Sequence, residues 1–377
     1  MEGNVQYRRR LWVVAAIVAV AAFVAISSGT TPVASGKTSS TAAGLKLAEA
    51  ALTQATSFPK EIAVTAPHTK PIPKGKSIEW INCGVTACTQ EGNVVASAAK
   101  ILGWKFTALQ TTGEPQSVQA AFQTAVTTKP TAVLSTGFNQ DEFAPQLKKL
   151  AAEGVGVYEC CTTDTPLVGG DRLINLSTAG NQGLAGQAAA AWVTVQTKAK
   201  ANVLYVDLPD YTILQQEKTT FYADLAKYCT GCTVANIDIP LSGIATAAST
   251  IVSYLRAHPS VNWVQLCQDA LAPGLPAALK AAGLSKKVQF SGIGPTAIDY
   301  QYVADGQESA TVEWPQYEVL YQLVDAVARH ITGEPLAPDN QEPTDYHIID
   351  RANVKESGPT IPITKGLVAA YTKLWGR

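Results

Sequence analysis

The sequence predicts an α/β fold with two parallel sheets. Strand-like and helix-like segments alternate from about residue 76 onward, which is the pattern of right-handed βαβ units. The strong strand candidates are almost continuously apolar, as expected for strands that helices cover on both faces. The candidate strands are too numerous for one open sheet, so we expect two.

The strongest strand candidates are short apolar runs rich in β-branched residues. They lie at 77–82 (SIEWIN), 131–136 (TAVLST), 155–160 (VGVYEC), 202–207 (NVLYVD), 261–267 (VNWVQLC) and 287–293 (KVQFSGI). Weaker strand patterns lie at 104–109, 172–176, 233–239, 309–314 and 345–350. Continuous rather than alternating hydrophobicity indicates that the strong candidates occupy the sheet interiors.

Ala-rich segments with helical periodicity separate the strands. They lie at 91–102, 115–128, 141–153, 182–197, 213–228, 244–257, 270–282 and 316–332. Gly103, Gly154 and Gly283 fall where three of these helices should end, a position that favours glycine. A lone helix is expected at 43–57, followed by a Pro-bearing tether at 59–75.

Length and charge limit the function classes. The chain has 377 residues, 46% hydrophobic and 16% charged, which predicts about two folded domains and argues against disorder. A net charge of −1 leaves no basic excess to neutralise phosphates, so no nucleic-acid partner is expected. The four His residues are scattered and form no HExxH motif, so we expect no metal site and no cofactor.

The N-terminus has the features of an export signal. Arg8–Arg10 precede an apolar run at 11–26, and Val33-Ala34-Ser35 in the polar stretch that follows suits signal cleavage. The run is long for a signal core and short for a membrane span, so an uncleaved anchor stays open as the alternative. Residues 1–40 are thus interpreted as a signal peptide or N-terminal membrane anchor. The protein is expected in the periplasm or at the cell surface.

Seven Cys residues in an exported chain favour disulfides between close pairs. The CxxC motif that ends at Cys232 follows a helix and precedes a strand. A redox CxxC has the reverse order, so a structural bridge is the better interpretation. Vicinal Cys160 and Cys161 are expected to remain separate thiols, and the state of Cys267 stays open. The predicted disulfides are Cys83–Cys88 and Cys229–Cys232.

Several runs in a fixed order carry a family resemblance. They include LKKLAAEGVGVYECC, NLSTAGNQGLAGQAAAAWV, VQLCQDALAPGLPAALKAAG, VQFSGIGPT and YHIIDRANV. Their order over 76–377 resembles the type I periplasmic solute-binding proteins of ABC importers, in the ribose/galactose-binding branch. This resemblance implies two Rossmann-like lobes with parallel sheets joined by a three-strand hinge. The implied lobes are 76–177 plus 315–344 and 178–314 plus 345–377, with the helix and tether at 41–75 preceding them.

The resemblance also implies a function. The protein would be an exported monomer that captures a small solute by lobe closure and delivers it to the membrane permease of an ABC importer. Hinge crossovers are expected near Ser177–Gly180, Trp314–Pro315 and Pro343–Tyr346. One alternative is a receptor of the same fold that presents its ligand to a membrane signalling partner. An exported enzyme is disfavoured because no nucleophile–base motif appears.

Candidate ligand contacts follow from topology, since ligands of open α/β sheets sit beyond the carboxyl ends of the strands. Aromatic walls and a few polar groups are expected there. Each candidate has a structural alternative as a core, hinge-packing or helix-capping residue. The candidates are Phe138, Tyr211 and Trp314 as walls, Thr89, Gln90, Asn139, Asp210, Gln268 and Glu313 as polar contacts, and Cys161, Asp269 and Gly294 at other strand ends.

The chain departs from the sugar-binding members at their hydroxyl-reading positions. Cys161 and Gly294 stand where the resemblance implies Asp, Glu217 where it implies Arg, and Trp314 where it implies Gln. Only Gln268 keeps an amide, and Glu217 is expected to be a solvated helix charge. The ligand implied by the resemblance is therefore either sugar-like or less hydroxylated, with an aromatic or amphiphilic part. Because sugar hydroxyls need paired polar groups, the departures favour the less hydroxylated class.

Overall fold

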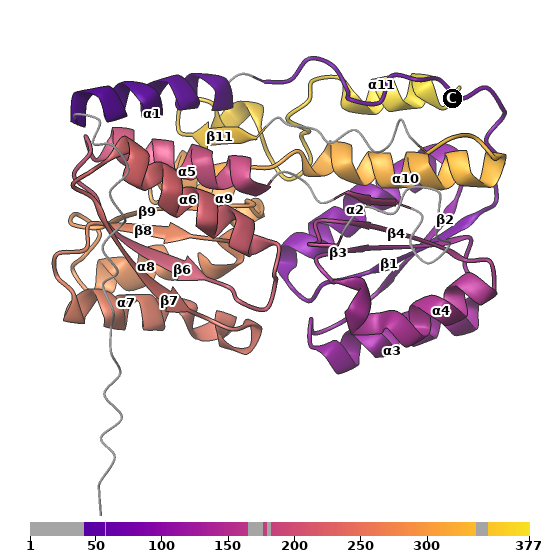
Figure 1. Cartoon of the computed structure of the whole chain (residues 1–377), viewed down its shortest axis with the longest axis horizontal. Helices are drawn as coiled ribbons and strands as arrows, with labels where there is room; N and C mark the ends of the chain where they lie inside the picture. Colours follow the sequence, from indigo (N-terminus) through magenta and orange to yellow (C-terminus); the bar gives the residue numbers. More distant parts are fainter. Residues whose placement is uncertain (1–40, 57, 165–175, 179–181, 337–345) are drawn as a thin grey trace, which may run out of the picture. The chain divides into compact units, whose positions relative to one another are not determined.

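The computed structural model describes residues 41–56, 58–164, 176–178, 182–336 and 346–377. Within these ranges the chain forms two sheets, each with helices on both faces (Figure 1). The predicted leader at 1–40 and parts of two predicted hinge crossovers lie outside the described residues. In the described part of the chain, no helix has the length and hydrophobicity needed to cross a bilayer.

The first sheet is parallel throughout, with strand order β2-β1-β3-β4-β5. Helices α2 (Thr86–Leu102) and α10 (Gln316–Thr332) lie over one face, and α3 (Pro115–Thr128) and α4 (Ala144–Ala152) over the other (Figure 1). The central strands are buried on both sides, which explains their unbroken hydrophobicity. The strands are β1 (Ser77–Ile81), β2 (Lys105–Leu109), β3 (Ala132–Thr136), β4 (Gly156–Cys160) and β5 (Leu176–Thr178).

The second sheet has the order β11-β10-β9-β8-β6-β7. Helices α5 (Gln182–Gln196) and α6 (Leu214–Tyr228) lie over one face, and α7 (Ala247–Ala257) and α8 (Leu275–Ala281) over the other (Figure 1). The strands are β6 (Asn202–Asp207), β7 (Thr233–Asp238), β8 (Trp263–Leu266), β9 (Gln289–Ile293), β10 (Ala310–Glu313) and β11 (His347–Asp350).

The predicted α/β fold with parallel sheets is confirmed, with one antiparallel strand as the exception. β11 runs antiparallel to β10, with Glu313 opposite His347. The chain between these strands forms α10, which packs on α2 and β4 of the first sheet. The helix between β10 and β11 thus packs on the other sheet and not on their own. The right-handed βαβ rule, which applies to a helix packed on the sheet of its two strands and makes those strands parallel, does not apply to this connection.

The predicted strands are present wherever the structure describes them. For the strand predicted at 172–176, residues 172–175 lie outside the described residues, and β5 begins at Leu176. The predicted helices are confirmed with shifted boundaries. Pro276 at the start of α8 and left-handed Gly274 before it delay that helix to Leu275. Two short helices were not predicted, α9 (Ala297–Ala304) and α11 (Leu367–Leu374). Short 3-10 turns precede three of the helices and lie at Gln140–Phe143 (η1), Leu241–Thr246 (η2) and Asp269–Leu271 (η3).

The segment expected to be a tether is hydrogen-bonded to α10. The imidazole of His68 lies between Asp325 (Nε2–Oδ1 2.8 Å) and Glu334 (Nδ1–Oε2 2.9 Å). Arg329 donates to the carbonyl of Ala66 over 2.5 Å. Because these contacts are buried, residues 58–75 pack as part of the folded body instead of acting as a free linker.

Helix α1 (Thr41–Ala55) docks on α5 and α6. A Cβ atom at Gly44 would lie 2.1 Å from the carbonyl oxygen of Tyr228, so only glycine permits this approach. At the other end of the chain, the ring of Trp375 stacks on Tyr321 of α10, with centroids 5.6 Å apart. Both ends of the described chain are thus fixed by packing.

Candidate ligand-binding site

The principal pocket lies where the carboxyl ends of both sheets meet. It has a cavity volume of about 70 Å³, and the space between its walls, which includes open solvent, is about 570 Å³. Its walls come from the segments after β1, β3 and β4 of the first sheet and after β6, β8 and β10 of the second. The lining residues are Cys83, Val85, Ala87, Cys88, Glu91, Thr136, Gly137, Cys161, Gln182, Leu208, Tyr211, Ile213, Leu214, Gln268, Ala270 and Trp314.

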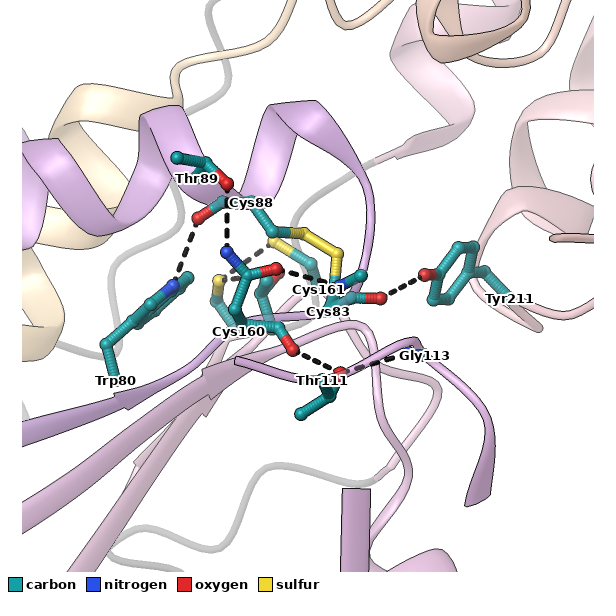
Figure 2. The surroundings of a disulfide bond; sticks show 12 residues. Trp80, Cys83, Cys88, Thr89, Thr111, Gly113, Cys160, Cys161 and Tyr211 are labelled. Carbon is teal, nitrogen blue, oxygen red and sulfur yellow. Dashed lines mark hydrogen bonds between the residues drawn. A yellow bond between two sulfur atoms is a disulfide. The ribbon is translucent and has the colours of Figure 1, made fainter. Parts of the chain in front are cut away.

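A disulfide-bridged loop forms one wall. The structure pairs Cys83 with Cys88, whose Cα atoms lie 5.6 Å apart, so the bridge joins the end of β1 to the first turn of α2 (Figure 2). Trp80 Nε1 donates to the Cys88 carbonyl over 3.0 Å, and the Tyr211 hydroxyl donates to the Cys83 carbonyl over 2.7 Å. The second of these bonds connects a loop of the second sheet to the bridged loop of the first.

Asn82 holds the same loop from inside. Its side chain donates to Thr89 Oγ1 over 3.0 Å and accepts the Gly84 N–H at 2.8 Å, while its carbonyl accepts from Thr111 Oγ1 at 2.6 Å. Thr89, a predicted ligand contact, therefore supports the loop and does not line the pocket.

Sulfur atoms also occupy the floor of the pocket. Cys161 lies in the lining with a left-handed backbone (φ 61°), and its thiol donates to Cys160 Sγ over 3.0 Å. Burial, reinforced by Cys160 and Glu91, raises the pKa of Cys161 well above its ordinary value. Cys160, Cys161 and Cys267 are all free and buried, which agrees with the prediction of separate vicinal thiols. A thiol that stays protonated is not an activated nucleophile.

Glu91 and Gln182 are polar lining residues that the sequence did not identify as ligand contacts. Glu91 points into the pocket from α2, is only 5% exposed, and its Oε2 atom has no hydrogen-bond partner in the described chain. Burial raises its pKa from 4.5 to about 8. The sequence placed the helix start at 91, whereas α2 begins at Thr86, so Glu91 lies on the inward face of the second turn.

Four predicted contacts come together in the pocket: Cys161, Tyr211, Gln268 and Trp314. Gly294 lies behind them in a left-handed conformation (φ 72°), and a Cβ atom there would lie 2.6 Å from Gln268 Oε1. A side chain at this position would thus push the Gln268 amide out of place.

The other predicted contacts lie outside the lining. Asn139 caps η1 and donates to Thr212 Oγ1 over 2.9 Å, linking loops of the two sheets. Asp210 accepts the Leu241 N–H at 2.9 Å. The remaining residues are Phe138, which is buried in the core, Gln90, half-buried on α2, and the buried carboxyl groups Asp269 and Glu313. Ligand contact by these residues stays a prediction.

The expectation that Glu217 is a solvated helix charge is wrong. Glu217 is 0% exposed, and burial, with Asp207 and Asp269 nearby, raises its pKa well above the ordinary value. The cause is the close packing of α5 on α6, because a Cβ atom at Gly186 would lie 2.1 Å from the Glu217 carbonyl oxygen. Helix α5 therefore covers the Glu217 side chain, which the sequence predicted to face water.

Three buried carboxyl groups behind the pocket have metal-like spacing. Atoms of Asp269, Asp299 and Glu308 lie within 4.8 Å of one another. Thr311 donates to Asp269, and Thr296 Oγ1 donates to Asp299 over 2.6 Å. Burial raises the pKa of each carboxyl group, which favours protonated groups that hydrogen-bond to one another. The cluster therefore does not require a cation.

The family described as "Periplasmic binding protein domain" matches residues 72–335. No curated protein matches the sequence. Among solved structures, an ABC sugar transporter subunit from Rhodobacter sphaeroides is similar at a TM-score of 0.62 and 21% identity, covering 74% of this chain and 99% of its own.

Two further structures show the same fold. One is an ABC transporter solute-binding protein from Agrobacterium vitis bound with α-D-tagatopyranose (TM-score 0.65, 18% identity, 74% of this chain and 96% of that one). The other is the 5-methylthioribose transporter solute-binding protein from Thermotoga lettingae in complex with 5-methylthioribose (TM-score 0.63, 19% identity, 81% and 95%). At such identities the similarity concerns the fold, and the ligands named are those of the other proteins.

Proposed function

Because the chain belongs to the periplasmic binding protein family, a family of solute-binding proteins and not of enzymes, we propose that it captures a small solute and delivers it to an ABC permease. The observation that carries the proposal is the pocket itself. Its walls come from the carboxyl ends of strands in both sheets, so one molecule would contact both.

Lobe closure is the proposed mechanism. The Tyr211–Cys83 and Asn139–Thr212 hydrogen bonds join loops of the two sheets and form only when these loops approach. A solute that contacts both sides favours the closed arrangement by its differential affinity. The predicted division into two discontinuous lobes is part of this proposal.

The proposed ligand is less hydroxylated than a simple pentose or hexose. Support comes from the wall residues, which are mostly apolar or aromatic, with Trp314 on one side and Leu208 and Tyr211 on another. Few polar side chains are present to replace the water that surrounds sugar hydroxyls. The Thermotoga lettingae protein in complex with 5-methylthioribose is an example of this fold that accommodates a sugar with a thioether.

The proposal also includes export through residues 1–40, with the disulfides formed after export.

Small-angle scattering on the mature protein, with and without the solute that co-purifies with it, tests solute capture. We expect compaction on binding, and a particle whose dimensions never respond to any bound solute would contradict closure. Reconstitution with a permease in vesicles would then separate delivery from the alternative sensing role.

A further inference from the structure

Among the residues that the structure describes, the lining of the pocket contains one carboxyl group and no basic side chain. Among the described lining residues, the other titratable side chains that face Glu91 are the Cys161 thiol and the Tyr211 hydroxyl. Burial raises the pKa of both groups, so both stay neutral at physiological pH. Glu91 is therefore the group in this lining that changes charge between about pH 5 and 9.

Two buried acceptors in the pocket lack donors. Glu91 Oε2 and Gln182 Oε1 have no hydrogen-bond partner in the described chain, and each residue is 5% exposed. Buried acceptors of this kind are normally satisfied, because an unmade hydrogen bond in the interior is costly. Since both belong to the lining of the same cavity, a molecule in that cavity can supply the missing donors.

We propose that the captured solute is an amphiphilic cation whose protonated amine pairs with Glu91 while its apolar body lies against Trp314 and Tyr211. This inference rests on the proposed function, and it names the substrate class of the same site. An ammonium group supplies several donors and a compensating charge. A neutral hydroxyl would supply one donor and no charge, so Glu91 would stay protonated beside it and no ion pair would form.

Proton release provides a signature of this pairing. With a pKa near 8, Glu91 is mostly protonated at pH 7 in the empty pocket. Binding of an ammonium group ionises it, and the proton leaves to solvent while the solute keeps its own charge. Affinity therefore rises with pH by up to about tenfold per unit below pH 8 and levels off above it.

Calorimetry with matched pairs tests the proposal. The probes are 2-phenylethylamine, tryptamine and cyclohexylamine, each with the alcohol that replaces its amine by a hydroxyl, and D-allose. Titrations at pH 6.5 and 9 in two buffers of different ionisation enthalpy measure the proton count. We expect an amine to bind at least about tenfold more tightly than its alcohol, releasing about one proton at pH 6.5 and almost none at pH 9.

Glu91→Gln should abolish the amine preference, weakening amine binding about 10- to 100-fold, and should remove the proton release. Glu159→Gln is the matched control. Glu159 is also fully buried, burial raises its pKa to about 8, and it hydrogen-bonds Ser135 away from the pocket lining. This variant should keep both the preference and the proton release.

Other outcomes overturn the inference. Equal affinity for an amine and its alcohol, or an amine preference that survives Glu91→Gln, would exclude the ion pair. Binding of D-allose alone would exclude the cation and leave solute capture intact. If no probe binds, mass spectrometry of any molecule that the protein releases on denaturation identifies the natural solute and tests the inference directly. A primary amine supports the inference, a neutral molecule overturns it, and an empty protein counts against solute capture as well.

Discussion

Replacing Glu91 by Gln should make the protein more stable at alkaline pH. The folded pocket raises the pKa of this carboxyl from 4.5 to about 8, entirely through burial. A raised folded-state pKa means that the native protein holds a proton that the unfolded chain releases above pH 4.5. Glu91 therefore costs no stability below pH 4.5. Its cost to the free energy of unfolding grows between pH 4.5 and 8 and is constant above pH 8. At about 1.4 kcal/mol per pH unit, the full penalty approaches about 5 kcal/mol.

Urea unfolding of both proteins at pH 5, 6, 7, 8 and 9 measures this cost. The free energy of unfolding of Glu91→Gln relative to the parent should increase by up to about 1.4 kcal/mol per pH unit between pH 5 and 8 and then level off. Glu153→Gln, at an exposed carboxylate that pairs with Lys129, should show a flat difference. A flat difference for Glu91→Gln as well would mean that this carboxyl is hydrated and ordinary, and would refute the reasoning.

Three other predictions concern the framework around the pocket. Gly292→Ala should destabilise the protein by about 1–3 kcal/mol in urea unfolding, because a Cβ atom there would lie 1.5 Å from Asp269 Oδ1. Gly231→Ala, with nothing within 4 Å, is its control, and equal stabilities would contradict the packing argument. Tyr211→Phe should remove the hydrogen bond to Cys83 and weaken calorimetric binding of the co-purifying solute about fivefold; unchanged affinity would show that the bond does not support closure. Of seven Cys residues, three should react with a thiol reagent in denaturant and all seven after reduction, whereas seven at the outset would exclude both disulfides.

The sequence was sufficient for the strands because burial on both faces leaves a local pattern. The runs at 131–136 and 155–160 became β3 and β4 almost residue for residue. The direction of β11 was not readable in this way. It depends on the route of the chain through α10, and nothing in YHIIDRANV records that route.

The site was only partly predictable, for two physical reasons. The strand-end rule placed Tyr211, Gln268 and Trp314 in the pocket, because it needs only the ends of strands. It missed Glu91, because the inward face of a helix is fixed by where that helix starts, and α2 starts before the predicted position. The second reason is that burial by a neighbouring helix leaves no mark in the local sequence. Glu217 is an example, because α5 covers it, whereas its local sequence is compatible with a carboxylate that faces water.

The predicted departures from sugar-binding proteins, together with the buried Glu91, determine which differences between ligands the pocket can distinguish. A pocket that spreads charge-assisted hydrogen bonds over many hydroxyl groups distinguishes ligands by their stereochemistry. Here Cys161 and Trp314 line the pocket at positions where the sequence resemblance predicts polar side chains, and Glu91 provides one ionisable group on a mostly apolar wall. An apolar wall separates skeletons that differ by a methylene group only about 10- to 200-fold. For a single buried carboxyl group, affinity depends more strongly on whether the ligand carries a charged donor than on the size of its apolar body. The pocket should therefore tolerate changes in the apolar body of its solute more readily than loss of the group that faces Glu91.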